Sequence, residues 1–185
     1  MSTQNVKHVF EVFPMLETPR LILREVVSSD APALIGLATY DGFTATNETE
    51  VLTILRKINI NYTQGDSILW GICLRSPDTT NHDTTNHDTS PVIGLCSYHR
   101  GYANNVGEIG YVLAPQQRGQ GIMTEAVTCI SEFGLRTMQL DAVVAYVDVI
   151  NPASANVLQR AGFQQHEHNT QNETLTFMKY ASTRG

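Results

Sequence analysis

Hydrophobic residues recur along the chain with two different periods, and the switches between them predict the order of strands and helices. Runs that alternate, or that are short and nearly all apolar, predict strands at residues 20–26, 68–74, 92–99, 106–113, 142–147, 163–168 and 174–180. Apolar residues spaced three and four apart after capping residues predict helices from residue 31, at 48–62, at 119–138 and between 151 and 162. This order indicates an α/β fold, in which a mixed sheet carries helices on its faces.

The chain has 185 residues, which suits one domain with its own core. Residues 1–16 are expected to form an N-terminal arm, with an apolar foothold at Val9, Phe10 and Phe13. Residues 17–182 are expected to form a single domain.

A polar segment at 76–90 separates two of the predicted strands and contains a tandem repeat. The pentapeptide DTTNH occupies residues 78–82 and again 83–87. Its composition predicts a hairpin loop enlarged by duplication. Its histidines and aspartates could bind a metal, but a flexible loop must lose much conformational entropy to form such a site. We therefore expect a solvated loop and no metal site.

The net charge limits the classes of partner that the protein can bind, and the cysteines indicate its cellular compartment. The formal net charge is −6, so the surface repels phosphate backbones and anionic membranes, and we expect no nucleic-acid or membrane partner. No run approaches the length of a membrane span. Cys73, Cys96 and Cys129 lie far apart inside apolar runs, and such unpaired thiols fit a reducing compartment. The protein is expected to be cytoplasmic.

The segment 111–123 joins a predicted strand to a predicted helix through a short loop that contains Gly119 and Gly121. The first amides of a helix have no intrahelical acceptors and carry the positive end of the helix dipole. Glycines let an anion approach the backbone closely, so the loop is typical of a pyrophosphate cradle. It is neither a P-loop nor a dinucleotide fingerprint, since no Gly-Lys-Ser/Thr follows and position 124 is threonine.

The same loop, read as Gln116-x-x-Gly119-x-Gly121, resembles the signature of the GNAT superfamily of N-acetyltransferases. Three other segments resemble that superfamily in the right order: LETPRLILR at 16–24, EIGYVLAP at 108–115 and NPASANVLQRAGF at 151–163. The first of these is similar to the opening strand of the ribosomal-protein (Rim-type) N-terminal acetyltransferases. Together the segments cover nearly the whole chain.

The resemblance implies a specific fold and a co-substrate, acetyl-CoA, without a metal. The sheet should be mostly antiparallel and should splay between its fourth and fifth strands, which carry Val112 and Ala145. The pantetheine arm should lie in that gap as a surrogate strand. The implied acetyl-CoA contacts are Val112, Leu113, Gln116, Gln117, Arg118, Gly119, Gln120, Gly121, Ile122, Asn151 and Asn156. Arg118 could also be a solvated arginine, and Asn151 a plain helix cap.

The resemblance also implies direct attack of a free amine on the thioester, with two candidate catalytic side chains. Ser154 is the candidate donor of a proton to the CoA sulfur, although a serine in a first helical turn can simply bond its own helix. Glu108 is the candidate base, acting through a water, although carboxylates on strands are often solvated. His99 ends a strand near the expected amine channel and could contact the substrate.

Three functions remain open from the sequence. The Rim-type segments favour acetylation of the N-terminal α-amine of a protein or peptide. A small amine, such as a polyamine, an amino acid or an aminoglycoside, would need the same motifs. A non-catalytic acyl-CoA-binding module is the third. The chain is expected to act as a monomer or homodimer.

Overall fold

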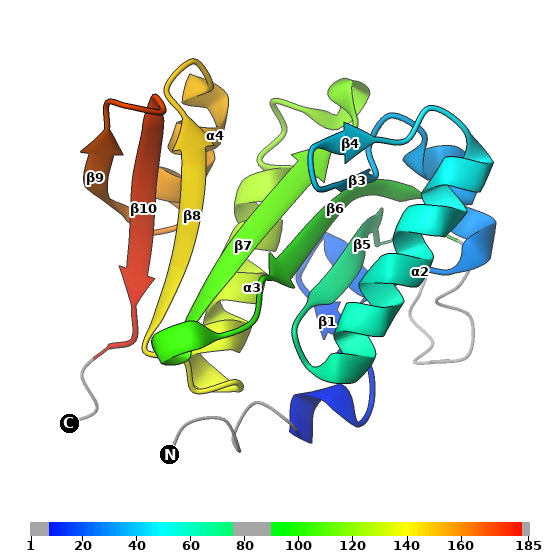
Figure 1. The fold of residues 1–185 in the computed structure, drawn as a ribbon, viewed down its shortest axis with the longest axis horizontal. Helices are drawn as coiled ribbons and strands as arrows, with labels where there is room; N and C mark the ends of the chain where they lie inside the picture. The colour runs from blue at the N-terminus through cyan, green and yellow to red at the C-terminus, as the bar shows by residue number, and fades with distance from the viewer. Residues whose placement is uncertain (1–7, 76–89, 183–185) are drawn as a thin grey trace.

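The computed structural model describes residues 8–75 and 90–182, so both copies of the DTTNH repeat lie outside the described residues. Within this part, eight strands form one sheet in the order β1-β2-β5-β6-β7-β8-β10-β9 (Figure 1). Neighbouring strands are antiparallel except β7 and β8, which are parallel. Their bounds are β1 Leu16–Glu17, β2 Leu21–Glu25, β5 Ile68–Leu74, β6 Val92–His99, β7 Val106–Leu113, β8 Ala142–Asp148, β9 Gln164–Asn169 and β10 Thr174–Tyr180. The expected mixed α/β sheet is confirmed.

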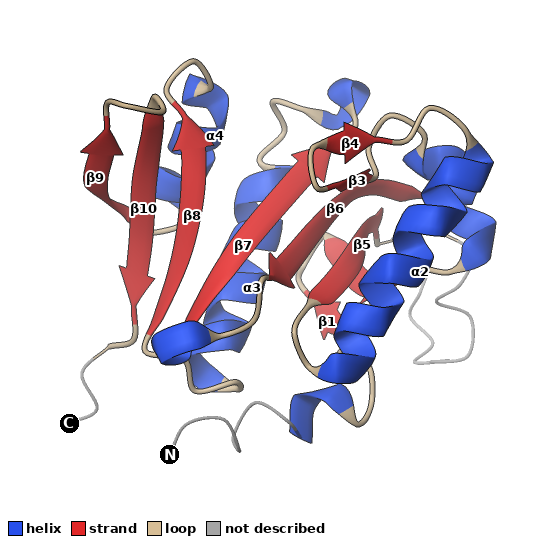
Figure 2. Ribbon diagram, viewed as in Figure 1, coloured by secondary structure: helices blue, strands red, loops and turns tan. Residues whose placement is uncertain are grey.

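Helices cover both faces of this sheet (Figure 2). Helix α2 and the 3-10 helix η2 pack on one face, and α3 and α4 pack on the other. The hairpin of β3 and β4 lies above the upper ends of the strands, on the α2 side (Figure 1). The bounds are η1 His8–Phe10, η2 Ser28–Leu34, β3 Thr39–Tyr40, β4 Phe43–Thr44, α2 Glu48–Gln64, η4 Ala103–Asn105, η5 Pro115–Gln117, α3 Ile122–Arg136 and α4 Pro152–Arg160.

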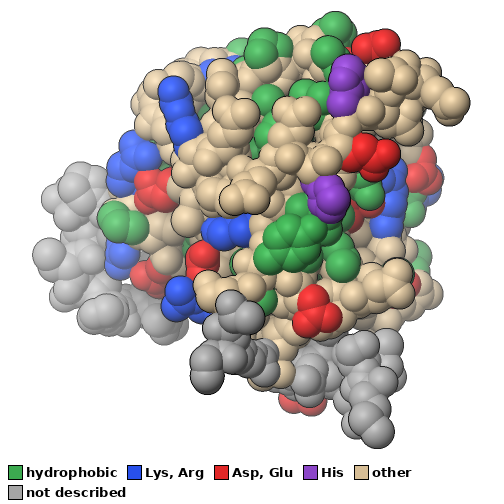
Figure 3. All heavy atoms as spheres, turned by 90° about the vertical axis from the view of Figure 1, so that its left-hand side faces the viewer, with side chains coloured by type: hydrophobic (Ala, Val, Ile, Leu, Met, Phe, Trp, Pro, Cys, Tyr) green, Lys and Arg blue, Asp and Glu red, His purple; other side chains and the backbone are tan. Residues whose placement is uncertain are grey.

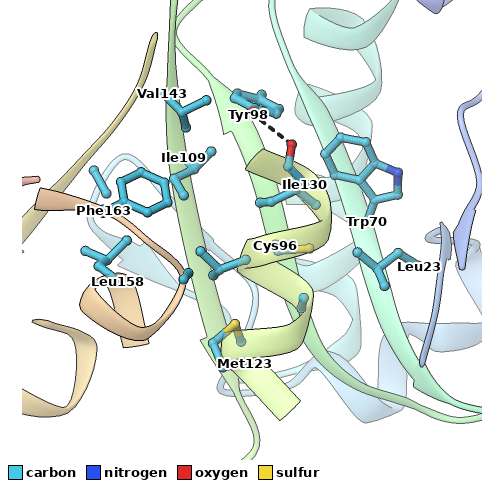
Figure 4. Close-up of a cluster of buried hydrophobic side chains, with 14 of the residues drawn as sticks. Leu23, Trp70, Cys96, Tyr98, Ile109, Met123, Ile130, Val143, Leu158 and Phe163 are labelled. Atoms are coloured by element: carbon cyan, nitrogen blue, oxygen red, sulfur yellow. Dashed lines mark hydrogen bonds between the residues drawn. The ribbon is translucent and has the colours of Figure 1, made fainter. Parts of the chain in front are cut away.

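Each face of the sheet has its own hydrophobic cluster. The larger cluster lies under α3 and α4 and includes the fully buried Trp70, Tyr98 and Phe177 (Figure 4). The smaller cluster lies under η2 and α2. Since the strands between them are covered on both sides, they consist of nearly continuous apolar runs.

The residues before β1 take part in the larger cluster. Val9 is buried, and Phe10 and Phe13 pack against the cluster. The Trp70 Nε1 group donates a hydrogen bond to the Pro14 carbonyl oxygen at 2.6 Å. The expected apolar foothold is therefore present, and the part of the arm from His8 onward is attached to the core.

The helix expected from residue 31 is a 3-10 helix that starts earlier. The position before its first residue is Val27, so the polar residues expected to cap the helix, Ser28, Ser29 and Asp30, lie inside its first turn. The Asp30 carboxylate accepts from the Val27 amide at 2.9 Å and from both terminal nitrogens of the buried Arg24 at 2.8 Å. Pro32 lies inside the segment and provides no amide donor, which limits regular α-helix formation.

Strands β7 and β8 separate after their first three residues, as expected from the resemblance. Their parallel register is Val106↔Ala142, Gly107↔Val143 and Glu108↔Val144. Both strands continue well beyond these pairs, and Figure 1 shows them diverging toward the ends at Leu113 and Asp148. The result is a V-shaped gap in an otherwise continuous sheet.

The edge of the sheet that β9 forms is polar. Every residue of β9 is exposed, and this side of the molecule carries histidine, acidic and basic side chains (Figure 3). Polar residues on an edge strand discourage further strand pairing. Among the described helices, none is long and apolar enough to cross a membrane.

Candidate active site

A glycine loop lies at the wide end of the gap between β7 and β8. After β7 ends at Leu113, the short helix η5 leads to Gly119 and Gly121, whose φ angles are +77° and +75°. Both values are in the left-handed region, where glycine avoids the strain that other residues suffer. Since left-handed backbone cannot continue a helix, α3 begins at Ile122, three residues after the expected start.

The N-terminus of α3 is open to an anion. Its N-cap is Gly121, which has no side chain to accept hydrogen bonds from the first amides of the helix. These amides have no intrahelical acceptors, and they carry the positive end of the helix dipole. A helix N-terminus of this kind could hold a phosphate group.

Two arginines lie beside this loop. Arg20 was not among the predicted site residues; it donates to the Gln120 carbonyl oxygen at 3.0 Å and pairs with Glu125 at 2.6 Å. Arg118 donates from Nε to the Leu113 carbonyl oxygen at 3.2 Å and so folds back over the end of β7. Only the tertiary structure shows the position of Arg20, because this residue directly precedes β2, about a hundred residues away in the sequence.

The register of β7 determines which main-chain groups face the gap. The Ala114 amide donates to the Ile93 carbonyl oxygen beside β6. Because main-chain groups alternate in direction along a strand, the amide and carbonyl groups of Val112 also point toward β6. The main-chain groups of Leu113 and Tyr111 therefore point toward β8, in the stretch where β8 has separated. Of the two residues predicted to pair with pantetheine, only Leu113 directs its main-chain groups to the side where no strand pairs with β7.

Ser154 is close to a tyrosine that the sequence analysis did not assign. Tyr111 extends from β7 to α4, where its hydroxyl lies 2.7 Å from Ser154 Oγ. Burial raises the pKa of Tyr111, and the hydrogen bond with Ser154 offsets part of that rise. Asn151 caps α4 and accepts a hydrogen bond from the Ser154 amide at 3.1 Å. Asn156 is exposed on the same helix.

A pocket of about 720 Å³ lies on the α2 face of the sheet and reaches β7 at Gly110, Tyr111 and Val112. It extends under the β3–β4 hairpin to Ser67 at the start of β5. Ser67 is only 5% exposed, and its hydroxyl has no hydrogen-bond partner among the described residues. A buried donor without a partner is costly, so a polar ligand group here would be stabilised. The pocket therefore has the character of a ligand site.

Glu108 lies beside this pocket in a cluster of charged groups. Its Oε1 atom is 2.9 Å from His99 Nε2, and it also accepts a hydrogen bond from Arg100 Nη1. Burial raises the pKa of Glu108, but the hydrogen bond and charge of His99 and the charge of Arg100 outweigh it, so the pKa lies below its usual range. Ser97 Oγ is 3.4 Å from the other ring nitrogen, His99 Nδ1.

The structure thus places the predicted residues in three locations. The loop 116–121, Ile122 and the end of β7 form one group at the wide end of the gap. Asn151, Ser154 and Asn156 belong to α4, which is joined to β7 through Tyr111. Glu108 lies on the pocket face of β7, near the start of the gap. Among the described residues there is no cluster of three potential metal ligands.

Comparison with known proteins identifies the relatives of this arrangement. The sequence profile of the acetyltransferase (GNAT) domain family matches residues 20–164. An uncharacterised N-acetyltransferase of Bacillus subtilis, YoaA, is 28% identical over 162 residues, which cover 83% of this chain and 85% of the relative.

Two solved structures share the fold. Mycobacterium smegmatis RimJ in complex with CoA-disulfide superposes with a TM-score of 0.71 at 19% identity, covering 91% of this chain and 86% of that one. The dodecameric spermidine N-acetyltransferase of Vibrio cholerae has a TM-score of 0.68 at 14% identity, covering 89% and 95%. At such identities these structures establish the fold and leave the substrate open.

Proposed function

The chain belongs to the GNAT family of acetyltransferases and is an acyltransferase, and we propose that it transfers the acetyl group of acetyl-CoA to the N-terminal α-amine of a protein or peptide. The observation that carries this proposal is the gap between β7 and β8. A glycine loop and the uncapped N-terminus of α3 lie at its wide end, and a pocket on the α2 face reaches the separated part of β7 at Gly110, Tyr111 and Val112.

The proposed acetyl-CoA site uses the main chain more than side chains. The free amides of the α3 N-terminus, with residues Gln116 to Gly121, would hold the pyrophosphate, and Arg20 and Arg118 would add positive charge. The free edge of Leu113 and Tyr111 would pair with the pantetheine arm in the place of a missing strand. Asn151 and Asn156 on α4 would border the same arm.

The proposed reaction uses groups from both strands and helices that border the gap. The amine nitrogen attacks the acetyl carbon, and a main-chain amide on the free edge of β7 stabilises the oxyanion. The Ser154–Tyr111 pair then supplies a proton to the departing thiolate. A phenol is suited to this step because its ordinary pKa of about 10 is not far above the pKa of about 8.5 of a thiol.

An α-amine is favoured as the acceptor by the absence of a strong base among the predicted catalytic residues. An α-amino group has an ordinary pKa of about 7.7–8.0, against about 10.4 for a lysine side chain. The lowered pKa of Glu108 makes it a weak base. An α-amine loses its proton with such modest help near neutral pH.

The protein is proposed to work in a reducing compartment, as the cysteines suggest. Cys73, Cys96 and Cys129 are all free thiols, and the first two are buried. Burial raises the pKa of all three, which keeps them protonated and unreactive.

An acetylation screen tests the function directly. Acetyl-CoA would be offered with a panel of amines while released CoA is measured with a thiol reagent. The panel should hold peptides with free α-amines, the same peptides with blocked N-termini, polyamines, amino acids and aminoglycosides. We expect turnover with free peptides and none with blocked ones. Preference for a polyamine or aminoglycoside would contradict the acceptor class, and CoA binding without any turnover would indicate a binding module.

Substitution of Gly121 by valine tests the cradle. A branched side chain at a left-handed position on the rim of the anion site should lower CoA affinity at least about 10-fold, or about 1.4 kcal/mol, in calorimetry. Gly36→Val is the matched control, because Gly36 has a φ of +77° and lies on the α2 face, away from the loop. Unchanged CoA affinity in folded Gly121→Val would rule out the cradle.

A further inference from the structure

His99 lines the pocket on the α2 face, next to the point where β7 separates from β8. It is the last residue of β6, and its cross-strand neighbour is Glu108, the last residue of β7 that pairs with β8. Its side chain is 33% exposed and lines the pocket. Tyr98, the preceding residue, points to the opposite face and is buried under α3, so alternation along β6 holds His99 on the pocket side.

A glycine makes room for the imidazole at this position. A Cβ atom added to Gly110 would lie 2.9 Å from His99 Cε1 and 3.4 Å from Nδ1. The ring therefore lies across β7, directly over a residue where β7 has already left β8. Any side chain at position 110 would push the ring away from the gap.

The contact with Glu108 determines which ring nitrogen carries a hydrogen. The Glu108 carboxylate can only accept, so its 2.9 Å contact requires a hydrogen on His99 Nε2. In the neutral ring this leaves the lone pair on Nδ1, with Ser97 Oγ 3.4 Å away. A carboxylate that holds one nitrogen of a histidine and leaves the other as a base is a common arrangement in catalysis.

The charged groups around His99 come from several elements. Glu108 of β7 contacts it directly, and Arg100 in turn contacts Glu108. Across the pocket, the exposed Asp41 follows β3 and the exposed Asp66 precedes β5. These carboxylates favour a cationic amine in the pocket, and Arg100 offsets part of the charge of Glu108.

Glu108 is less suited to take a proton than the histidine that it holds. One of its oxygens already accepts hydrogen bonds from two side chains, and these contacts keep its pKa below the usual range. A base works best when its pKa is close to the working pH, and imidazole, with an ordinary pKa of about 6.5, is the side chain nearest to neutrality.

We propose that His99 is the catalytic base that accepts the proton of the acceptor amine, and that Glu108 and Ser97 are positioning residues for it. This inference rests on the proposed function. The amine lone pair forms the N–C bond to the acetyl carbon while one N–H proton passes to His99 Nδ1. The C–S electron pair leaves on sulfur, which takes a proton from the Ser154–Tyr111 pair. The imidazolium then gives its proton to solvent, and the Ser154–Tyr111 pair takes one proton back from solvent.

Replacing His99 by glutamine tests the catalytic role. We expect kcat/KM for a peptide amine to fall about 100-fold or more near pH 7, because general-base catalysis contributes about 10²–10⁴. The deficit should shrink toward about pH 9–10, where the amine is already unprotonated. CoA affinity should stay unchanged in calorimetry. His168→Gln on the exposed strand β9 is the matched control, and its kinetics should equal those of the wild type.

Two further measurements separate a catalytic role from a structural one. Nitrogen-15 NMR of the imidazole should show the hydrogen on Nε2 in the wild type and a mixture of both forms in Glu108→Gln. Gly110→Ala keeps the identity of every proposed side chain but displaces the His99 ring, so it should lower kcat/KM with unchanged CoA affinity.

The outcomes also distinguish this inference from the proposed function. If the wild-type protein acetylates no amine on the panel, both are overturned. If it acetylates peptides and His99→Gln keeps the wild-type rate and pH profile, the role of His99 alone is overturned. A wild-type ring with its hydrogen on Nδ1, or a loss of CoA affinity in His99→Gln, would also overturn that role.

Discussion

At the scale of single residues, the site depends on pairs whose members come from different parts of the chain. Tyr111 and Ser154 share a 2.7 Å hydrogen bond although 43 positions separate them. Serine alone is a poor acid for a thiolate, whereas a phenol with a serine beside it can pass a proton and recover one. We therefore propose the pair, rather than the serine alone, as the proton donor.

Removing either hydroxyl tests this pairing. Ser154→Ala and Tyr111→Phe should each lower kcat about 10- to 100-fold, at the low end of general-acid effects because a thiolate is already a fair leaving group. The acetyl-CoA KM should change little, since the contact matters only as charge develops on sulfur. If the two act as one relay, the double variant should be no slower than the worse single one. Additive losses, or a change in KM alone, would contradict the relay.

At the scale of elements, the position of α3 depends on small residues that let it approach the sheet. Tyr98 of β6 lies under α3 and donates to the Ile130 carbonyl oxygen at 3.0 Å (Figure 4). A Cβ atom on Gly134 of α3 would lie 2.0 Å from the Tyr98 hydroxyl oxygen, and one on Gly107 of β7 would lie 2.6 Å from the ring. Close contact here sets the height of α3 above the sheet, and with it the position of the glycine loop.

Gly134→Ala changes the stability in two opposite ways, through helix propensity and through core packing. Alanine favours a helix interior by about 1 kcal/mol over glycine. Overpacking a buried site costs about 1–3 kcal/mol, and Tyr98 is fully buried and has no room to move. We expect net destabilisation of up to about 2 kcal/mol in denaturant unfolding. Adding Tyr98→Phe removes the nearest clashing atom and should recover part of the loss, whereas a more stable Gly134→Ala would contradict the close contact.

At the scale of the whole molecule, the gap interrupts a sheet that is otherwise continuous. On one side of it lie β7 and its antiparallel neighbours, and on the other lie β8, β10 and β9. The two parts are joined by three pairs of strand residues, by α3 and α4 beneath the sheet and by the Tyr111–Ser154 contact. A molecule that fills the gap should therefore stabilise the whole fold.

Thermal unfolding with and without CoA measures that effect. A ligand at about 100 times its Kd adds about 2.7 kcal/mol of stability. For a chain of this size each kcal/mol raises the Tm by about 2–4 °C, so a rise of about 5–10 °C is expected. Gly121→Val should lose most of the rise, and Gly36→Val should keep it. An equal rise in both variants would show that CoA binds elsewhere.

The sequence by itself determined the order of the elements, the fold class and the glycine loop, because these depend on local patterns. Periodicity places α2, β5, β6 and β7 within a few residues of their observed bounds. The left-handed glycines at 119 and 121 are the local exception, since they delay the start of α3. The splay of the sheet came from the resemblance to a family, and the structure confirms it.

Only the tertiary structure decided which side chains meet. The register of β6 against β7 places His99 beside Glu108 and over Gly110, and a shift of one residue would turn them to opposite faces. The same register, rather than any residue preference, gives Leu113 instead of Val112 the free edge. Arg20 reaches the loop, and Tyr111 reaches Ser154, across long separations in the chain. Periodicity reports which face of an element is apolar, but not which elements lie beside it, and so the pairing of Tyr111 with Ser154 and of His99 with Glu108 could be seen only in the fold.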